Sequence, residues 1–311
     1  MAFKSLLAPA VHRLSLLSGH SARRARDQRA TRIIMLHGVG VPDCTAAAFE
    51  AQLAYLTRRF RVVSFASVVE RLARGEAPAP HEVALTFDDG LRNNLTVAYP
   101  LLKQYRAPAL FFLCPGLIDQ GCWLWVHEAR ERLRPLAPER AREIATPFGL
   151  PASVADLVGW MKTLATSRRH QVEQAIRAAT PRFQPTAAHR AQFDLMNWDE
   201  VRSLDPELVT IGGHSVTHPI LANCTPEELT TEVAGCRPLL EQRLGRPVNF
   251  FCYPNGDFNP AVLATTRATY QAAVTVKPGF VTAGADAHQL PRLSCADNLP
   301  LFTWRLHRIT A

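Results

Sequence analysis

One segment of this 311-residue chain restricts the folds available to it more than any other. Residues 82–87 (Glu-Val-Ala-Leu-Thr-Phe) form a short, mainly apolar, β-prone run that stops at two adjacent carboxylates and a glycine, Asp88, Asp89 and Gly90. A run without regular polar alternation is typical of a strand that is buried on both faces, as in a parallel sheet covered by helices. Both aspartates therefore follow the carboxyl end of a strand, which is where α/β barrels build their active sites.

A second polar run follows another predicted strand, at residues 209–213. It reads His214-Ser-Val-Thr-His218, and because residues four apart on one helical turn face the same way, we expect the two imidazoles to converge on one ion. Two imidazoles and a carboxylate form the donor set of a catalytic divalent metal. Taken separately, the acidic pair fits an ordinary turn and the histidines fit an exposed helix. At two strand ends together, they favour a metal-dependent hydrolase.

With these residues identified, the chain resembles the polysaccharide deacetylases, carbohydrate esterase family four, whose catalytic unit is the NodB homology domain. The resemblance extends over about residues 32–306. It implies an α/β fold, a distorted (β/α) barrel of the NodB homology type with a helical insertion. It also implies that Asp88 is the general base and that Asp89, His214 and His218 bind one divalent metal ion. Zinc is the expected ion, although other transition metals suit the same donors.

A third motif of the family is similar to residues 252–256, Cys-Tyr-Pro-Asn-Gly. The family's commonest pattern opens this motif with an arginine that orients the base, and Cys252 stands in its place. The backbone N–H of Asn255 can still contribute to an oxyanion hole, because a main-chain donor does not depend on the side chain. The orienting cation must then come from elsewhere. We expect Arg292 to supply it, although an arginine that only supports the start of a strand would look the same in the sequence.

The general acid has two candidates. Most family members take it from a Leu-x-His near the C-terminus, whereas this chain has Arg305-Leu306-His307, without the spacer. At the other end, residues 32–36 are a convincing strand that delivers His37 at its carboxyl end, and a branch of the family resembles this permuted arrangement. Because the first and last strands of a closed barrel are neighbours, either end could place an imidazole at the same spot. We expect His37 to be the acid and His307 to contribute packing.

The rest of the pattern predicts one barrel over residues 32–311, because α/β barrels of about 250 residues are common. Helices are expected at residues 46–60, 94–106 and 225–245. Strands are expected at residues 62–65, 109–114, 248–252 and 272–276. Between about 119 and 195 the alternation gives way to an arginine-rich helical insertion with three tryptophans, Trp123, Trp125 and Trp160. The insertion could form a lid or a substrate wall, since loops at that face carry specificity, or the tryptophans could only pack helices onto the barrel.

A basic arm, residues 1–31, precedes the barrel. Six of the eight net positive charges lie between Met1 and Arg32, so the barrel is nearly neutral and we expect no nucleic-acid-binding face. Apolar residues at helical spacing suit contact with an anionic membrane surface, whereas Pro9 suits a disordered tail. The arm is a poor secretory signal, and seven cysteines without CxxC spacing favour reduced thiols. We therefore expect a cytoplasmic protein, and the arm leaves both alternatives open, a peripheral contact at the inner face of the membrane and a disordered tail.

Together these features predict a metal-dependent hydrolase that removes N-acetyl groups from the amino sugars of a bacterial polysaccharide or glycoconjugate. The same site chemistry would serve hydrolysis of a small non-sugar amide. The missing arginine of the third motif leaves another alternative, a non-catalytic glycan-binding protein on a deacetylase fold. The complete ligand set and Asp88 argue against this alternative.

Overall fold

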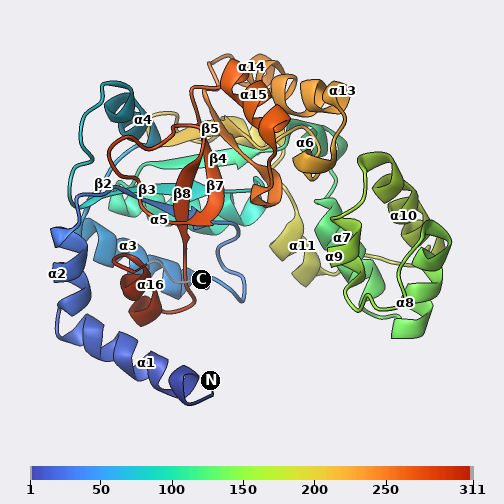
Figure 1. Ribbon diagram of the computed structural model, residues 1–311, viewed down its shortest axis with the longest axis horizontal. Helices are drawn as coiled ribbons and strands as arrows, with labels where there is room; N and C mark the ends of the chain where they lie inside the picture. Colours follow the sequence, from blue (N-terminus) through green and yellow to red (C-terminus); the bar gives the residue numbers. More distant parts are fainter. Residues whose placement is uncertain (1, 309–311) are drawn as a thin grey trace.

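The structure is a computed structural model that describes residues 2–308, with side chains described over residues 7–308 (Figure 1). Within these residues, seven parallel strands close into a barrel, because β1 pairs with β3 on one side and with β8 on the other. The expected distorted (β/α) barrel is therefore confirmed. In chain order its strands are β1 (Arg32–Leu36), β3 (Glu82–Phe87), β4 (Ala109–Leu113), β5 (Val209–Gly213), β6 (Phe250–Cys252), β7 (Ala272–Pro278) and β8 (Leu290–Ser294).

The barrel is distorted at one side. β6 has three residues and pairs with β5 only through Gly213 and Phe251, and the register between β7 and β8 shifts between Val274 and Pro278. A further strand, β2 (Arg61–Val62), pairs with the start of β3 outside the ring. The strand pairing is therefore least regular around β6, the strand that ends at Cys252 of the third motif.

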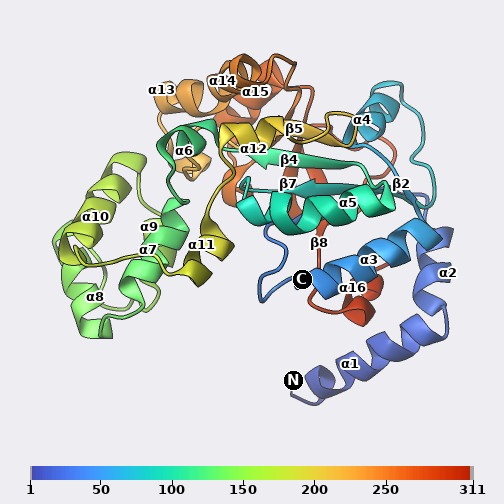
Figure 2. The same ribbon diagram turned by 180° about the vertical axis from the view of Figure 1, so that it is seen from behind.

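Helices cover the outside of the barrel (Figure 2). Their apolar sides pack on the outward side chains of the strands, among them Ile34, Phe87 and Phe111. The covering helices are α3 (Ala46–Arg59), η1 (Asn94–Ala98) with α5 (Tyr99–Tyr105), α13 (Pro226–Leu229) with η4 (Thr230–Ala234) and α14 (Cys236–Leu244), α15 (Pro260–Thr269) and α16 (Leu299–Arg305).

A second apolar cluster fills the interior of the barrel. It contains alternate strand residues such as Ala84, Phe112 and Val274, as expected where successive side chains point to opposite faces. Phe65 of α4 (Phe65–Ala73) joins this cluster and meets the ring of Phe250 edge to face at 4.9 Å. In Figure 2, β4 points away from α4. Helix α4 therefore closes the end where the strands begin, and polar residues gather at the opposite end.

Two local predictions are wrong. Residues 62–65 do not form one strand, because β2 ends at Val62 and Ser64 caps α4 by accepting a hydrogen bond from the backbone N–H of Ser67. Residues 214–218 do not form a helical turn but an irregular loop after β5. The other expected elements are present within two residues of their predicted bounds, with the helix over 225–245 interrupted by the π-helical η4.

The connection from β4 to β5 contains the helical insertion, which lies to the right of the barrel in Figure 1. Its inner residues form a separate apolar cluster that includes Trp125, Met161, Val172 and Ile176. The helices of this connection are α6 (Pro115–Gln120), α7 (Trp125–Leu133), α8 (Pro138–Ala145), α9 (Leu157–Met161), α10 (Thr166–Ala179), α11 (Ala187–Phe193) and α12 (Trp198–Arg202).

The N-terminal arm is helical. It forms α1 (Ala2–Leu17) and α2 (His20–Asp27), and α1 packs against α16. Within residues 2–308, no helix combines the length and the apolar character that crossing a membrane requires.

Arg32, the first residue of β1, ties the arm to the barrel. Its side chain is fully buried, and its guanidinium donates hydrogen bonds to the carbonyl oxygens of Ala25, Ala30 and Leu306 and to Oε1 of Gln28. Burial lowers the pKa of Arg32 to about 10, which leaves it charged at neutral pH. A buried cation is tolerated only where such acceptors replace water. One side chain thus joins the arm, β1 and the C-terminal segment.

Replacing Arg32 by methionine should lower the free energy of unfolding by about 3 kcal/mol or more, because three buried acceptors and one partly buried acceptor lose their donor. Denaturant unfolding followed by circular dichroism measures this loss. Arg59, exposed at the end of α3, provides the matched control, and Arg59→Met should change the free energy by less than about 0.5 kcal/mol. Equal effects in the two variants would contradict the role given to Arg32.

Candidate active site

The candidate site lies at the carboxyl ends of the barrel strands, where side chains from four strands face the interior. Asp88 follows β3, His214 follows β5, Cys252 ends β6 and Arg292 lies in β8. All four are at most 2% exposed. The closed sheet therefore gathers residues that are more than two hundred positions apart in the chain into one polar cluster.

Arg292 holds Asp88 in a bidentate ion pair. Its Nη1 and Nη2 donate to Oδ1 and Oδ2 of Asp88, each at 2.7 Å, and its Nε donates to the carbonyl oxygen of Thr275 at 2.8 Å. Burial raises the pKa of the Asp88 carboxyl, but the charge and hydrogen bonds of Arg292 outweigh it, so the pKa lies below its ordinary value. Asp88 is therefore an ionised carboxylate of fixed orientation, which a proton acceptor requires.

Cys252 lies beside this pair, at the position of the family's usual arginine. Its Sγ is 3.5 Å from Oδ2 of Asp88 and 3.2 Å from Nη2 of Arg292. Burial raises the pKa of the Cys252 thiol, so the side chain is neutral. A small, neutral side chain on β6 leaves room for a guanidinium that arrives from β8.

Asp89, His214 and His218 form the predicted donor cluster. Oδ1 of Asp89 lies 3.4 Å from Nε2 of His214 and 3.6 Å from Nε2 of His218. One donor atom from each of the three buried residues lies within 4.8 Å of the other two. Asp88, His214 and Cys252 satisfy the same spacing, but there the carboxylate is already held by an arginine. Two nitrogens and one oxygen at such distances fit a divalent transition-metal ion.

The hydrogen bonding of His214 supports this fit. Nδ1 of His214 lies 2.8 Å from the carbonyl oxygen of Cys252, which can only accept, so Nδ1 carries a proton and Nε2 is the ring nitrogen that remains to bind a metal. Nε2 lies on the side of Asp89, 3.4 Å from its carboxylate oxygen, so both atoms are placed to bind one ion. Histidines that bind metals commonly donate their other ring N–H to a carbonyl in this way.

The backbone adopts strained conformations at the same place. Among the non-glycine residues that the structure describes, six have φ in the left-handed region, and four of them surround the site: Asp89 (72°), Ser215 (60°), His218 (58°) and Asn255 (57°). The backbone N–H of His218 donates to Oγ of Ser215 at 2.9 Å and so holds the loop. Each such conformation costs on the order of 1–3 kcal/mol. The imidazoles therefore converge through a constrained loop rather than through the helical turn that their spacing suggested.

The structure brings only one of the two candidate acids to this cluster. His37 follows β1, its Nε2 lies 3.9 Å from Oδ2 of Asp88, and its side chain is 52% exposed in the pocket that Asp88 and Asp89 line. His307 follows α16, is 5% exposed and packs against His20 and Trp304 at the arm.

Asn255 lines the same pocket from the short turn η5 (Pro254–Gly256) after β6. Its Oδ1 accepts a hydrogen bond from Nζ of Lys162 at 2.6 Å, and its Nδ2 donates to the carboxylate of Asp257. These contacts fix the turn of the third motif. They also join it to the insertion, because Lys162 directly follows α9.

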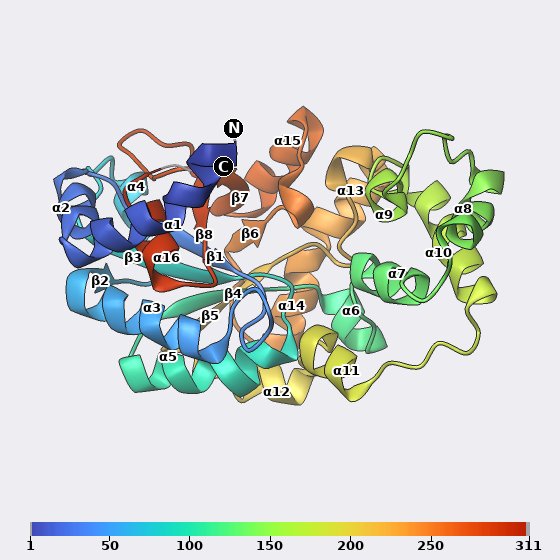
Figure 3. The ribbon, with the colours of Figure 1, turned by 90° about the horizontal axis from the view of Figure 1, so that it is seen from below.

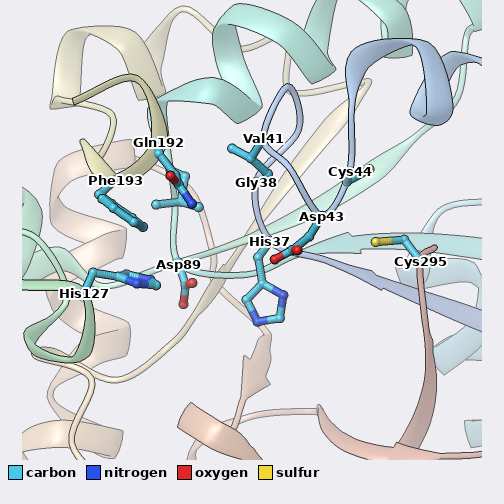
Figure 4. Close-up of a pocket in the computed structure, with 11 residues that line it drawn as sticks. His37, Gly38, Val41, Asp43, Cys44, Asp89, His127, Gln192, Phe193 and Cys295 are labelled. Atoms are coloured by element: carbon cyan, nitrogen blue, oxygen red, sulfur yellow. The ribbon is translucent and has the colours of Figure 1, made fainter. Parts of the chain in front are cut away.

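The insertion supplies the far wall of the pocket, which the sequence did not predict in detail. His127 of α7 lines this pocket and an adjoining one, in which it lies across from His37 (Figure 4). Its ring stacks on Phe193 of α11, with ring centroids 4.6 Å apart. Lys162 lies on the same side. No local pattern marks His127 or Lys162, because their place in the pocket depends on how the insertion folds back toward the strand ends.

Trp125 is buried and does not line the pocket, so its ring cannot contact a bound sugar there. It is 5% exposed, and its Nε1 donates to the carbonyl oxygen of His218 at 3.1 Å. Arg169 lies over its ring at 4.7 Å. Of the two alternatives for the tryptophans, packing is therefore the one that fits Trp125.

Comparison with known proteins assigns the class. The family model for polysaccharide deacetylase matches residues 75–273, and the chain belongs to this family. YxkH of Bacillus subtilis (strain 168), whose name also places it among polysaccharide deacetylases, is 19% identical over 266 residues, which make up 84% of this chain and 70% of the relative.

Solved structures share the fold. The deacetylase PplD of Streptococcus pyogenes, solved in complex with acetate, has a TM-score of 0.62 at 20% identity, over 90% of this chain and 98% of that chain. IcaB from Ammonifex degensii has a TM-score of 0.58 at 16% identity, over 90% and 98% of the two chains. At these identities the likeness concerns the barrel and not the residues of the site.

Replacing His214 by alanine should abolish stoichiometric binding of a divalent ion while the barrel stays folded, because Asp89 and His218 alone offer too few donors. Elemental analysis of the dialysed protein measures the ion, and circular dichroism checks the fold. Asp88→Asn is the matched control and should keep the ion, since Asp88 pairs with Arg292 instead. If Asp88→Asn lost the ion and Asp89→Asn kept it, the roles of the two aspartates would be reversed.

Proposed function

We propose that this protein is a metal-dependent hydrolase that removes N-acetyl groups from the amino sugars of a bacterial polysaccharide or glycoconjugate. Membership of the polysaccharide deacetylase family supports deacetylation of an acetylated polysaccharide. The observation that carries the metal-dependent mechanism is the position of the ion-paired carboxylate of Asp88 directly beside the donor cluster of Asp89, His214 and His218.

The donor cluster is the place where the site would hold a metal ion as its electrophile. A divalent ion held by Asp89, His214 and His218 would supply polarisation of the acetyl carbonyl and a more acidic water. The adjacent carboxylate of Asp88 is placed to accept a proton from the water that attacks the acetyl carbon. Arg292 keeps both oxygens of Asp88 in place during the transfer, since it contacts each of them at 2.7 Å.

His37 donates a proton to the nitrogen of the departing amine. An amine leaves poorly unless it is protonated, so the second half of the reaction needs an acid at the pocket. The side chain of His37 is half exposed, so a substrate in the pocket can reach it, and its Nε2 is 3.9 Å from Oδ2 of Asp88. The C–N bond then breaks, and the products are acetate and the free amino sugar.

The backbone N–H of Asn255 is the proposed donor to the carbonyl oxygen as it gains negative charge. Asn255 lines the pocket with a φ of 57°, in a turn that Lys162 and Asp257 hold through its side chain. A main-chain donor in a fixed turn needs no reorganisation during the reaction.

The non-catalytic alternative loses its main support. It depended on the arginine that is missing at Cys252. Arg292 places a guanidinium on Asp88 from another strand, so the carboxylate has the charged partner that a general base in this position needs.

The purified protein loaded with a divalent ion should remove acetyl groups from N-acetylated oligosaccharides, and mass spectrometry should record a loss of about 42 Da for each amide hydrolysed. Asp88→Asn should lower the rate by about 10²-fold or more, as expected for loss of a general base. Hydrolysis of small acetamides with intact oligosaccharides would refute the glycan assignment. Equal rates for the wild type and Asp88→Asn would refute the role of Asp88.

His37→Ala should be far more damaging than His307→Ala, because only His37 lies in the pocket. The loss, about 10²-fold, should appear with an acetamide and be much smaller with an activated acetate ester, whose leaving group needs no protonation. His307→Ala is the matched control, and it should retain nearly the wild-type rate on both substrates. Selective loss of amide hydrolysis in His307→Ala, with His37→Ala near wild type, would return the acid to the C-terminus.

A further inference from the structure

Helix α1 packs on the protein through a side that includes the polar residues His12 and Ser15. His12 lies against Trp304 of α16 at 5.0 Å between ring centroids, and Ser15 is buried with its hydroxyl 2.9 Å from that of Ser21. An amphipathic helix on a globular protein normally presents its apolar side to the core. In α1, by contrast, four of the five leucine and valine side chains over residues 7–17 are exposed.

The opposite side of α1 carries large apolar side chains in solvent. Leu7, Val11, Leu14 and Leu17 are 53%, 44%, 66% and 73% exposed, and we call them the apolar face of α1. Over residues 7–308, the other exposed large apolar side chains are Leu239 and Val276, each at 37%. A contiguous patch of this kind marks a contact surface rather than ordinary scatter.

Positive charge is concentrated on the same arm as the apolar face of α1. The arm exposes five arginines, and between Met1 and Arg32 it carries six of the eight net positive charges of the chain. The exposed arginines are Arg13, Arg23, Arg24, Arg26 and Arg29. Two copies of such a surface would repel each other if they met face to face, whereas an anionic surface would attract either of them.

We propose that the apolar face of α1 binds the surface of an anionic lipid bilayer. Leucine and valine side chains would enter the boundary between headgroups and acyl chains, and the arginines would contact the anionic headgroups. Because the side of α1 that carries His12 rests on α16, the helix can lie in the membrane plane without leaving the protein. In Figure 3, α1 lies over α16, well away from the insertion. Membrane contact therefore leaves the pocket free for substrate.

The test is sedimentation of the full-length protein with vesicles. One set contains phosphatidylcholine with about 30% phosphatidylglycerol, and the other contains phosphatidylcholine alone. The wild type should bind the anionic vesicles at least about tenfold more tightly than the neutral ones at low salt. Leu14→Ser/Leu17→Ser should weaken binding to the anionic vesicles by about tenfold or more, because two inserted side chains are lost.

Two control variants separate the apolar contribution from the electrostatic one. Leu239→Ser, an exposed leucine on α14, should bind like the wild type. Arg23→Gln/Arg24→Gln should weaken binding to anionic vesicles and leave the weak binding to neutral vesicles unchanged. Because all these side chains are exposed and far from the pocket, circular dichroism and the deacetylation rate on a soluble substrate should not change.

Two results would overturn the proposal. The first is equal sedimentation of the wild type and Leu14→Ser/Leu17→Ser with anionic vesicles. The second is a wild-type dimer in analytical ultracentrifugation that Leu14→Ser/Leu17→Ser converts into a monomer, which would assign the apolar face of α1 to a second copy of the chain.

Discussion

A carboxylate buried inside a barrel needs a buried counter-charge, and the ion pair of Asp88 with Arg292 meets this need. The pair spans from β3 to β8, which is feasible because β1 lies between these strands and pairs with both. With Asp88 balanced, the charge of Asp89 remains for a cation shared with His214 and His218. Two adjacent aspartates thus stay ionised in one buried cluster, each with a partner of its own.

The sequence is informative where local pattern decides the structure. Asp88 and His214 could be placed at strand ends because apolar runs stop directly before them, and the capping box at Thr225 marks the start of α13. Where tertiary contacts decide, local pattern misleads. Val62 and Phe65 look like parts of one strand, yet Ser64 starts a helix between them and Phe65 enters the barrel from its closed end.

The candidate site shows the same division. The acidic pair and the two histidines are marked by their motifs, and the missing arginine at Cys252 indicates that a cation must come from elsewhere. That the guanidinium of Arg292 reaches both oxygens of Asp88 depends on strand order and register, which no local pattern encodes. The place of His127 and Lys162 in the pocket could not be predicted at all, since the fold of the whole insertion brings them there.

The hydrogen bond from Trp125 to the carbonyl oxygen of His218 has a wider consequence. It joins the centre of the insertion's apolar cluster to the strained loop that carries two of the proposed ligands. By thermodynamic reciprocity, whatever holds that loop in its native conformation also favours the native insertion, and a molecule that presses on the insertion acts back on the loop. The insertion and the loop of the site are therefore not separable modules, because an indole N–H of one is hydrogen-bonded to a carbonyl oxygen of the other.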